Sequence, residues 1–128
     1  MSLLVLDSGG VTRLSRQSQE AAAIITVLKR DDLWPPKVPS AVLVGCLSRR
    51  QRTDALTNRF LKTCEIIEEL PQYLARRAGA LRALAQRGSA VDAIVVAMAE
   101  PGGAVLSGDL GDLRALASNS DGVLILRV

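Results

Sequence analysis

The sequence contains no histidine, and this absence excludes several kinds of site. None of its 128 residues is histidine. Catalytic triads and general bases that depend on an imidazole are therefore excluded, as is zinc held by histidine ligands. Any catalytic chemistry has to rely on other side chains.

Aromatic residues and cysteines are also scarce. One Trp, one Tyr and one Phe predict an aliphatic core, and they offer no platform on which nucleic-acid bases could stack. Cys46 and Cys64 form neither a disulfide framework nor a metal-binding spacing, which favours a reducing cytoplasm. Apolar runs are too short to span a membrane, and no basic region precedes the first one. We therefore expect a cytoplasmic protein without membrane contact, folded as a single domain over residues 1–128.

The order of apolar segments predicts an α/β fold with a mostly parallel central sheet. Short apolar runs typical of strands alternate with longer segments of helical spacing. We predict strands at 3–6, near 38, at 64–67, 104–107 and 123–128, and helices at 11–16, 17–30, 41–50, 54–62, 71–87, from 89 and at 113–117.

Acidic residues follow two of the predicted strands and begin the helix that leads into one of them. Asp7 ends the run LLVLD, Asp109 follows the strand at 104–107, and Asp92 lies in the first turn of the helix from 89. The carboxyl ends of parallel strands meet at one edge of a sheet, and ligands bind at that edge. We therefore expect these acids to meet at one rim.

Helix capping is the simpler explanation for each acid. Ser89-x-x-Asp92 and Asp109-x-x-Asp112 both fit a capping box, and Asp7 is placed to cap the helix after its strand. Asp92 fits this explanation least well, because it is the only ionisable group in AVDAIVVAMA and a buried carboxylate needs a partner or a cation. Oxygen ligands without His or Cys favour Mg²⁺ or Mn²⁺.

The runs VLDSG, SAVDAIVVAMA and VLSGDLGDL, in this order and spacing, resemble PIN domains, specifically the VapC-type toxin ribonucleases of bacterial toxin–antitoxin pairs. The likeness covers essentially the whole chain. It implies a three-layer PIN-like sandwich and a Mg²⁺- or Mn²⁺-dependent endoribonuclease that acts as a homodimer and is held inactive by a cognate antitoxin.

The resemblance also assigns roles to individual residues. Asp7, Asp92 and Asp109 would be metal ligands, directly or through water, and Asp112 a supporting catalytic acid. The hydroxyls of Ser8 and Ser107 would orient ligands or water. In that family the metal activates a water that attacks an RNA phosphodiester.

One position departs from the family pattern. A Glu normally follows in a context like VLxE, whereas this chain reads Val42-Leu43-Val44-Gly45. Glycine costs about 1 kcal/mol relative to alanine within a helix. Either Gly45 packs closely against a neighbouring segment, or a catalytic carboxylate has been lost and cleavage is impaired.

Two surfaces are candidates for partners. The clustered Arg49, Arg50 and Arg52 are expected to contact the RNA backbone. Apolar residues on two helices are expected either to pack in the core or to line a groove for an antitoxin helix, namely Ile24, Ile25, Leu28, Leu56 and Phe60.

Two other functions remain open. The chain could be an inactive binding module that holds an antitoxin or RNA without cutting. A phosphotransferase or receiver-like domain would also place an Asp after the first strand. VLDSG lacks a second acid two residues after Asp7, and no lysine follows a later strand, so this last class is disfavoured.

Overall fold

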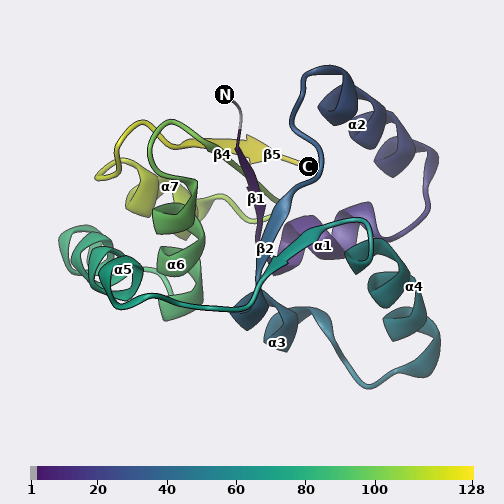
Figure 1. Cartoon of the computed structure of the whole chain (residues 1–128), viewed down its shortest axis with the longest axis horizontal. Helices are drawn as coiled ribbons and strands as arrows, with labels where there is room; N and C mark the ends of the chain where they lie inside the picture. The colour runs from purple at the N-terminus through teal and green to yellow at the C-terminus, as the bar shows by residue number, and fades with distance from the viewer. Residues whose placement is uncertain (1–2) are drawn as a thin grey trace.

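The computed structural model describes residues 3–128 and has a parallel sheet at its centre (Figure 1). Every strand pairing within this range is parallel, and the strand order is β3-β2-β1-β4-β5. The strands are β1 (Leu4–Leu6), β2 (Lys37–Pro39), β3 (Glu65–Ile67), β4 (Ala104–Ser107) and β5 (Leu124–Arg127). The predicted parallel sheet is confirmed.

Helices cover both faces of this sheet (Figure 1). They are α1 (Ser8–Leu14), α2 (Gln19–Arg30), the 3₁₀ turn η1 (Ser40–Val42), α3 (Leu43–Cys46), α4 (Gln51–Leu61), α5 (Gln72–Ala85), α6 (Ala90–Ala99) and α7 (Gly111–Ala117). On one face α1 contacts α2, α3 and α4, and on the other α6 contacts α5 and α7. The three-layer α/β arrangement predicted from the sequence is therefore confirmed.

The core is aliphatic, as the shortage of aromatic residues predicts. β1 and β4 are buried along their whole lengths, and α6 buries half of its residues in the same core. Apart from Ser107, the buried side chains of these elements are Ala, Val and Leu, which fill the space between sheet and helices and remove apolar area from water. Phe60 packs edge-on against Trp34 at 6.1 Å between ring centroids, near the border of this core.

The sheet has a switch point between β1 and β4. The chain runs from β1 outward through β2 to β3 and then crosses back to place β4 on the other side of β1. Crevices at the carboxyl ends of strands beside such a switch point are where ligands bind in open α/β sheets. Asp7 follows β1 and Ser107 ends β4, so both lie at this crevice.

The helix predicted at 41–50 is shorter than expected. A 3₁₀ turn leads into α3, which ends at Cys46. The chain then turns, because the backbone N–H and hydroxyl of Ser48 both donate to the Asp54 carboxylate and Arg49 adopts a positive φ of 63°. The Asp54 carboxylate therefore binds a residue before the helix, and α4 begins at Gln51, three residues before the predicted start of the helix at 54–62.

The capping box predicted for Asp109 and Asp112 is wrong. α7 begins at Gly111 after Leu110, without a side-chain cap. The hydroxyl of Ser107 accepts the backbone N–H of Asp109, so the turn after β4 is closed before the helix starts. The carboxylate of Asp109 is left outside the helix.

No helix in the described part of the chain is long and apolar enough to cross a membrane.

Candidate functional site

Asp7 and Ser107 lie side by side because their strands pair in register. Leu6 pairs with Leu106 in the parallel β1–β4 ladder, so the next residue of each strand reaches the same point on the sheet edge. The Asp7 side chain is 7% exposed. One of its carboxylate oxygens accepts the backbone N–H of Gly10 at 2.7 Å, and the other accepts the Ser107 hydroxyl at 2.5 Å. Asp7 therefore caps α1 and is also tied to β4.

The Ser107 hydroxyl joins the two loops at the switch point. Its oxygen lies 2.5 Å from the Asp7 carboxylate and 3.0 Å from the backbone carbonyl of Asp109. A hydroxyl has one proton to donate, and a charged acceptor at shorter distance binds it more strongly. We assign the proton to the bond with Asp7, while the same oxygen accepts the N–H of Asp109.

The pKa of Asp7 is raised above its ordinary value. Burial is the largest cause, because it disfavours the charged form, while the hydrogen bonds from Ser107 and Gly10 lower the pKa in part. The negative charges of Asp92 and Asp109 add to the upward shift. The acids that the sequence places at one rim therefore interact electrostatically with Asp7.

Asp92 closes the predicted capping box at the start of α6. The Ser89 hydroxyl accepts the N–H of Asp92, and a carboxylate oxygen of Asp92 accepts the N–H of Ser89 at 3.2 Å. Its side chain is partly exposed, in contrast to the buried carboxylate that the apolar sequence of this helix suggests. One of its oxygens remains without a hydrogen-bond donor among residues 3–128.

The two acids after β4 have different surroundings. Asp109 is exposed, and within the described chain its carboxylate forms neither a hydrogen bond nor an ion pair. Asp112 binds Arg87 at 2.8 Å, with the two side chains 47% and 58% exposed. Asp112 is thus neutralised by a residue within the α5–α6 connection, whereas Asp109 has no such partner among residues 3–128.

Glycines allow helices to approach this edge closely. A Cβ at position 10 would collide with the carbonyl oxygen of Leu106, so Gly10 lets α1 lie directly on β4. A Cβ at position 45 would lie 3.1 Å from the Ser8 Cβ and 3.3 Å from its hydroxyl oxygen. Gly45 therefore faces the residue after Asp7, and it packs closely against a side chain.

Cys46 also lies beside the rim, on α3. Burial raises the pKa of its thiol to about 11, and the negative charge of Asp7 contributes to the shift. A thiol with this pKa stays protonated at neutral pH and is a poor metal ligand or nucleophile. Cys46 accordingly acts as a small buried side chain, whereas Cys64, whose pKa burial also raises to about 11, is only partly buried.

The rim does not provide a complete set of metal ligands in this conformation. Among residues 3–128, no three Asp, Glu, Cys or His side chains are grouped closely enough to hold one ion. The donor chemistry would suit a hard cation, since every candidate is an oxygen. Asp92 is engaged in its cap and Asp112 in its ion pair, and position 45 supplies no carboxylate. The residues present therefore do not fit a three-carboxylate Mg²⁺ or Mn²⁺ site.

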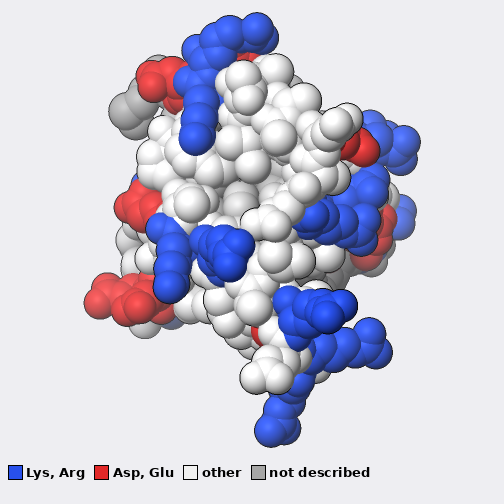
Figure 2. All heavy atoms as spheres, turned by 90° about the vertical axis from the view of Figure 1, so that its right-hand side faces the viewer, with Lys and Arg blue, Asp and Glu red and all other residues white. Residues whose placement is uncertain are grey.

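A groove runs between α2 and α4, where the sequence predicted an antitoxin-binding surface. Ile25, Leu56 and Phe60 line a hollow of about 370 Å³ together with the end of α1. Leu28 is buried in the core, and Ile24 borders a neighbouring hollow beside Arg13 and Arg16. Figure 2 views this side of the molecule and shows Lys and Arg side chains around a central surface without charged groups. The core explanation thus holds for Leu28 and also for Phe60, which is buried although it borders the groove. Ile25 and Leu56 line the groove and are partly buried.

The arginines predicted to contact RNA lie near this groove. Arg49 and Arg50 belong to the connection after α3, and Arg52 lies in the first turn of α4. All three are exposed. None of them forms an ion pair within the described residues.

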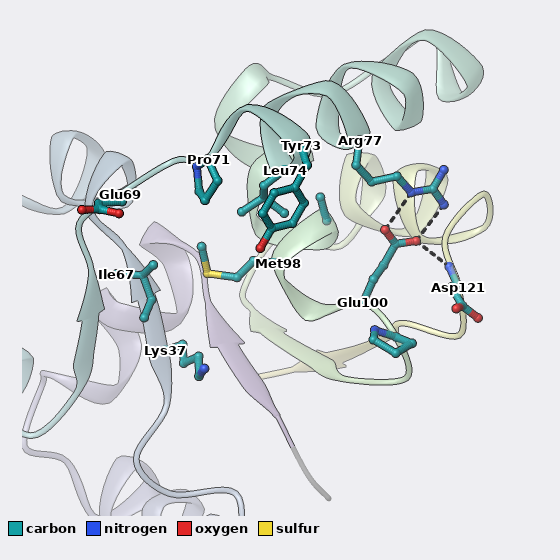
Figure 3. A pocket seen from close by; sticks show the side chains of 12 residues that line it. Lys37, Ile67, Glu69, Pro71, Tyr73, Leu74, Arg77, Met98, Glu100 and Asp121 are labelled. Atoms are coloured by element: carbon teal, nitrogen blue, oxygen red, sulfur yellow. Dashed lines mark hydrogen bonds and ion pairs between the residues drawn. The ribbon is translucent and has the colours of Figure 1, made fainter.

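A further cavity lies away from the acidic rim. It measures about 710 Å³ (Figure 3). Its walls are the start of β2, the β3–α5 connection, the N-terminal part of α5 and the C-terminal end of α6. Arg77 binds both oxygens of Glu100 at 2.8 Å each, and Glu100 also accepts the backbone N–H of Asp121 at 2.7 Å. This ion pair joins α5, the end of α6 and the turn before β5, which gives it a structural role.

Comparisons with known proteins support the architecture. A chain in the crystal structure of VapBC2 from Rickettsia felis, bound to a DNA fragment from their promoter, matches with a TM-score of 0.67 at 14% identity, covering 100% of this chain and 99% of that one. PAE2754 from Pyrobaculum aerophilum matches with a TM-score of 0.64 at 12% identity, covering 98% and 92%. The chain has a PIN-like fold. No protein-family model matches the sequence, and no curated protein matches it. At 12% and 14% sequence identity, the similarity of these two structures to this chain shows a shared fold and nothing more.

The sequence analysis missed two features of the site. It did not pair Arg87 with Asp112, because the two residues are 25 positions apart in sequence and meet only through packing of the helices. It also passed over Arg13 and Arg16, which line a hollow with Ser8 and Asp109. Their spacing of three residues, shortly after Asp7, would have placed them on one helical face beside the rim.

Proposed function

We propose that this PIN-like chain is the toxin of a toxin–antitoxin pair, an endoribonuclease whose cleavage is weak because position 45 lacks a carboxylate. The observation that carries the proposal is the buried Asp7 at the sheet's switch point, held by Ser107 and within the electrostatic influence of Asp92 and Asp109. A carboxylate with a raised pKa in a crevice is typical of a reactive site. The neighbouring position 45 is occupied by Gly.

The groove between α2 and α4 supports an antitoxin partner. It has an apolar floor of Ile25, Leu56 and Phe60, which suits the apolar face of an amphipathic helix. The similar Rickettsia felis structure is described as a complex of VapBC2, which is consistent with a partner protein for this chain. We propose that the antitoxin helix lies in this groove. The expected homodimer stays a prediction.

A second candidate is a module that binds RNA or an antitoxin without cutting. It is favoured by the lack, within residues 3–128, of three metal-binding side chains grouped around one point. Both candidate functions use the same surfaces to bind RNA and an antitoxin. They differ only in whether the acidic rim cleaves a phosphodiester bond.

The experiment that separates them measures cleavage of end-labelled RNA, with Mn²⁺ supplied, by the wild type and by Gly45→Glu and Gly45→Gln. Glu and Gln are similar in size and would contact Ser8 in the same way, so any loss of stability from this contact is common to both variants. The weakened-ribonuclease proposal expects faster cleavage by Gly45→Glu than by the other two proteins. Equal rates for all three would contradict it and leave the binding module.

A further inference from the structure

The hollow bordered by α1 and the β4–α7 loop adjoins the acidic rim. It measures about 340 Å³ and is lined by Ser8, Gly9, Thr12, Arg13, Arg16, Gly108 and Asp109. Ser8 directly follows Asp7, and Asp109 directly follows the Ser107–Gly108 turn, so one wall of the hollow belongs to the rim itself. A polymer crossing the rim would also pass through this space.

The two arginines of the hollow are available for a ligand. Arg13 and Arg16 are exposed, and neither forms an ion pair within the described chain. Arg13 donates one hydrogen bond, to the carbonyl oxygen of Val128 at 3.3 Å, and Arg16 donates none. Glu20 borders an adjoining hollow with both arginines but lies beyond ion-pair distance of them. Most of their guanidinium donors are therefore free.

The charges and donors of this hollow suit a phosphate. Two guanidinium groups face one carboxylate, that of Asp109, and the hydroxyls of Ser8 and Thr12 lie one helical turn apart on the same wall. Guanidinium groups bind phosphate oxygens with two parallel N–H donors, and hydroxyls add a single donor each. Phosphate contacts of this kind fix the position of a nucleic-acid strand without reading its bases.

We propose that Arg13 and Arg16 bind a backbone phosphate of single-stranded RNA next to the phosphodiester that lies at the acidic rim. This inference rests on the proposed function, since it assigns the path of the RNA across that site. The arginines act as positioning residues, because they hold the neighbouring phosphate and do not touch the bond at the rim. They would set the register of the strand relative to Asp7.

The test measures binding of a fluorescent single-stranded RNA by anisotropy at several salt concentrations, with EDTA present so that cleavage does not contribute. The wild type is compared with Arg13→Gln/Arg16→Gln and with a control, Arg30→Gln/Arg76→Gln, which removes the same charge from exposed positions outside the hollow. Thermal unfolding verifies that both variants are folded. Each phosphate contact with single-stranded nucleic acid contributes about 0.7 to the slope of log affinity against log salt.

The proposal expects the slope of the Arg13→Gln/Arg16→Gln variant to fall by about 0.7, the loss of one phosphate contact, while the control keeps the wild-type slope. Restoring charge with Arg13→Lys/Arg16→Lys should recover most of the salt dependence. If wild type binds RNA and the two Gln double variants behave alike, this assignment is overturned and the proposed function stands. If the wild type does not bind RNA at low salt, the assignment and the RNA-directed function both fail.

Discussion

The hydroxyl of Ser107 donates a 2.5 Å hydrogen bond to the carboxylate of Asp7, a residue 100 positions earlier in the chain. Parallel pairing of β1 with β4 brings the two together at the point where the strand order reverses. This bond favours the charged form of a carboxylate whose pKa is raised by burial. The pKa of Asp7 therefore depends on β4 as well as on β1.

Replacing Ser107 with alanine should raise the pKa of Asp7 further. The substitution removes a hydrogen bond to the charged form and leaves burial and the neighbouring negative charges in place. Carbon-13 NMR titration of the Asp7 side-chain carboxyl would measure the change, with Ser118→Ala on the exposed end of α7 as the control. An unchanged or lower pKa in Ser107→Ala would show that the hydrogen bond does not govern this carboxylate.

The ion pair of Arg77 with Glu100 should contribute to stability mainly at neutral pH. The hydrogen bond from Arg77 holds the pKa of Glu100 below its ordinary value of 4.5, and the Glu100 side chain is 11% exposed. A carboxylate with a lowered pKa contributes stability above its unfolded pKa and loses it as the pH falls through the folded value. Glu100→Gln should therefore lower the free energy of unfolding by about 1–3 kcal/mol at pH 7.

Chemical unfolding at pH 7 and at pH 3 measures this effect. The difference between wild type and Glu100→Gln should shrink at the lower pH, because protonation then weakens the pair in the wild type as well. Glu69→Gln, an exposed carboxylate beside the same cavity, serves as a control and should have little effect at either pH. A constant difference for Glu100→Gln across this range would rule out the ion pair as its cause.

A charge placed in the groove between α2 and α4 should weaken antitoxin binding. Leu56 lines this groove and is half-buried, so Leu56→Glu introduces a carboxylate where an apolar helix face would dock. Val27→Glu is the matched control, because Val27 is 41% exposed on α2 and does not line the groove. Binding to the candidate antitoxin, the protein encoded by the neighbouring gene, is measured by calorimetry, and folding by thermal melting. A loss of affinity equal in both variants, or one that only follows lost stability, would exclude the groove.

Neutralising Arg49, Arg50 and Arg52 should lower RNA affinity and flatten its salt dependence, because counterions are released when these charges meet phosphates. The anisotropy titration described for Arg13 and Arg16 applies here with the same control variant. If the triple Gln variant kept the wild-type slope of log affinity against log salt, these three arginines would not contact the RNA backbone.

The positions of β1 and β4 could be predicted because each lies in a short, apolar run. Leu4–Leu6 and Ala104–Ser107 are buried from end to end, so sequence periodicity and burial agree there. Asp7 and Asp92 were correctly predicted at the starts of helices. A capping side chain binds a backbone N–H only three residues away, so its role can be recognised from the local sequence. Apolar runs and helix caps can be predicted because each depends only on residues that are close together in the sequence.

Contacts between distant segments could not be predicted in the same way. The end of α3 depends on Ser48 binding Asp54, and the ion pair of Asp112 depends on how α5 and α7 pack. Whether three carboxylates share an ion depends on distances of a few ångströms that strand order alone does not determine. The sequence predicted a common rim, and the structure places Asp7 within the influence of two other acids without grouping three ligands.

The central claim is that Gly45 stands where a carboxylate would complete the site beside Asp7. Titration of Mn²⁺ into the wild type, Gly45→Glu and Gly45→Glu/Asp7→Asn, followed by the electron paramagnetic resonance signal of free Mn²⁺, tests this most directly. We predict that Gly45→Glu binds Mn²⁺ more tightly than the wild type and that Asp7→Asn removes the gain. Equally weak binding by all three folded proteins would contradict the claim.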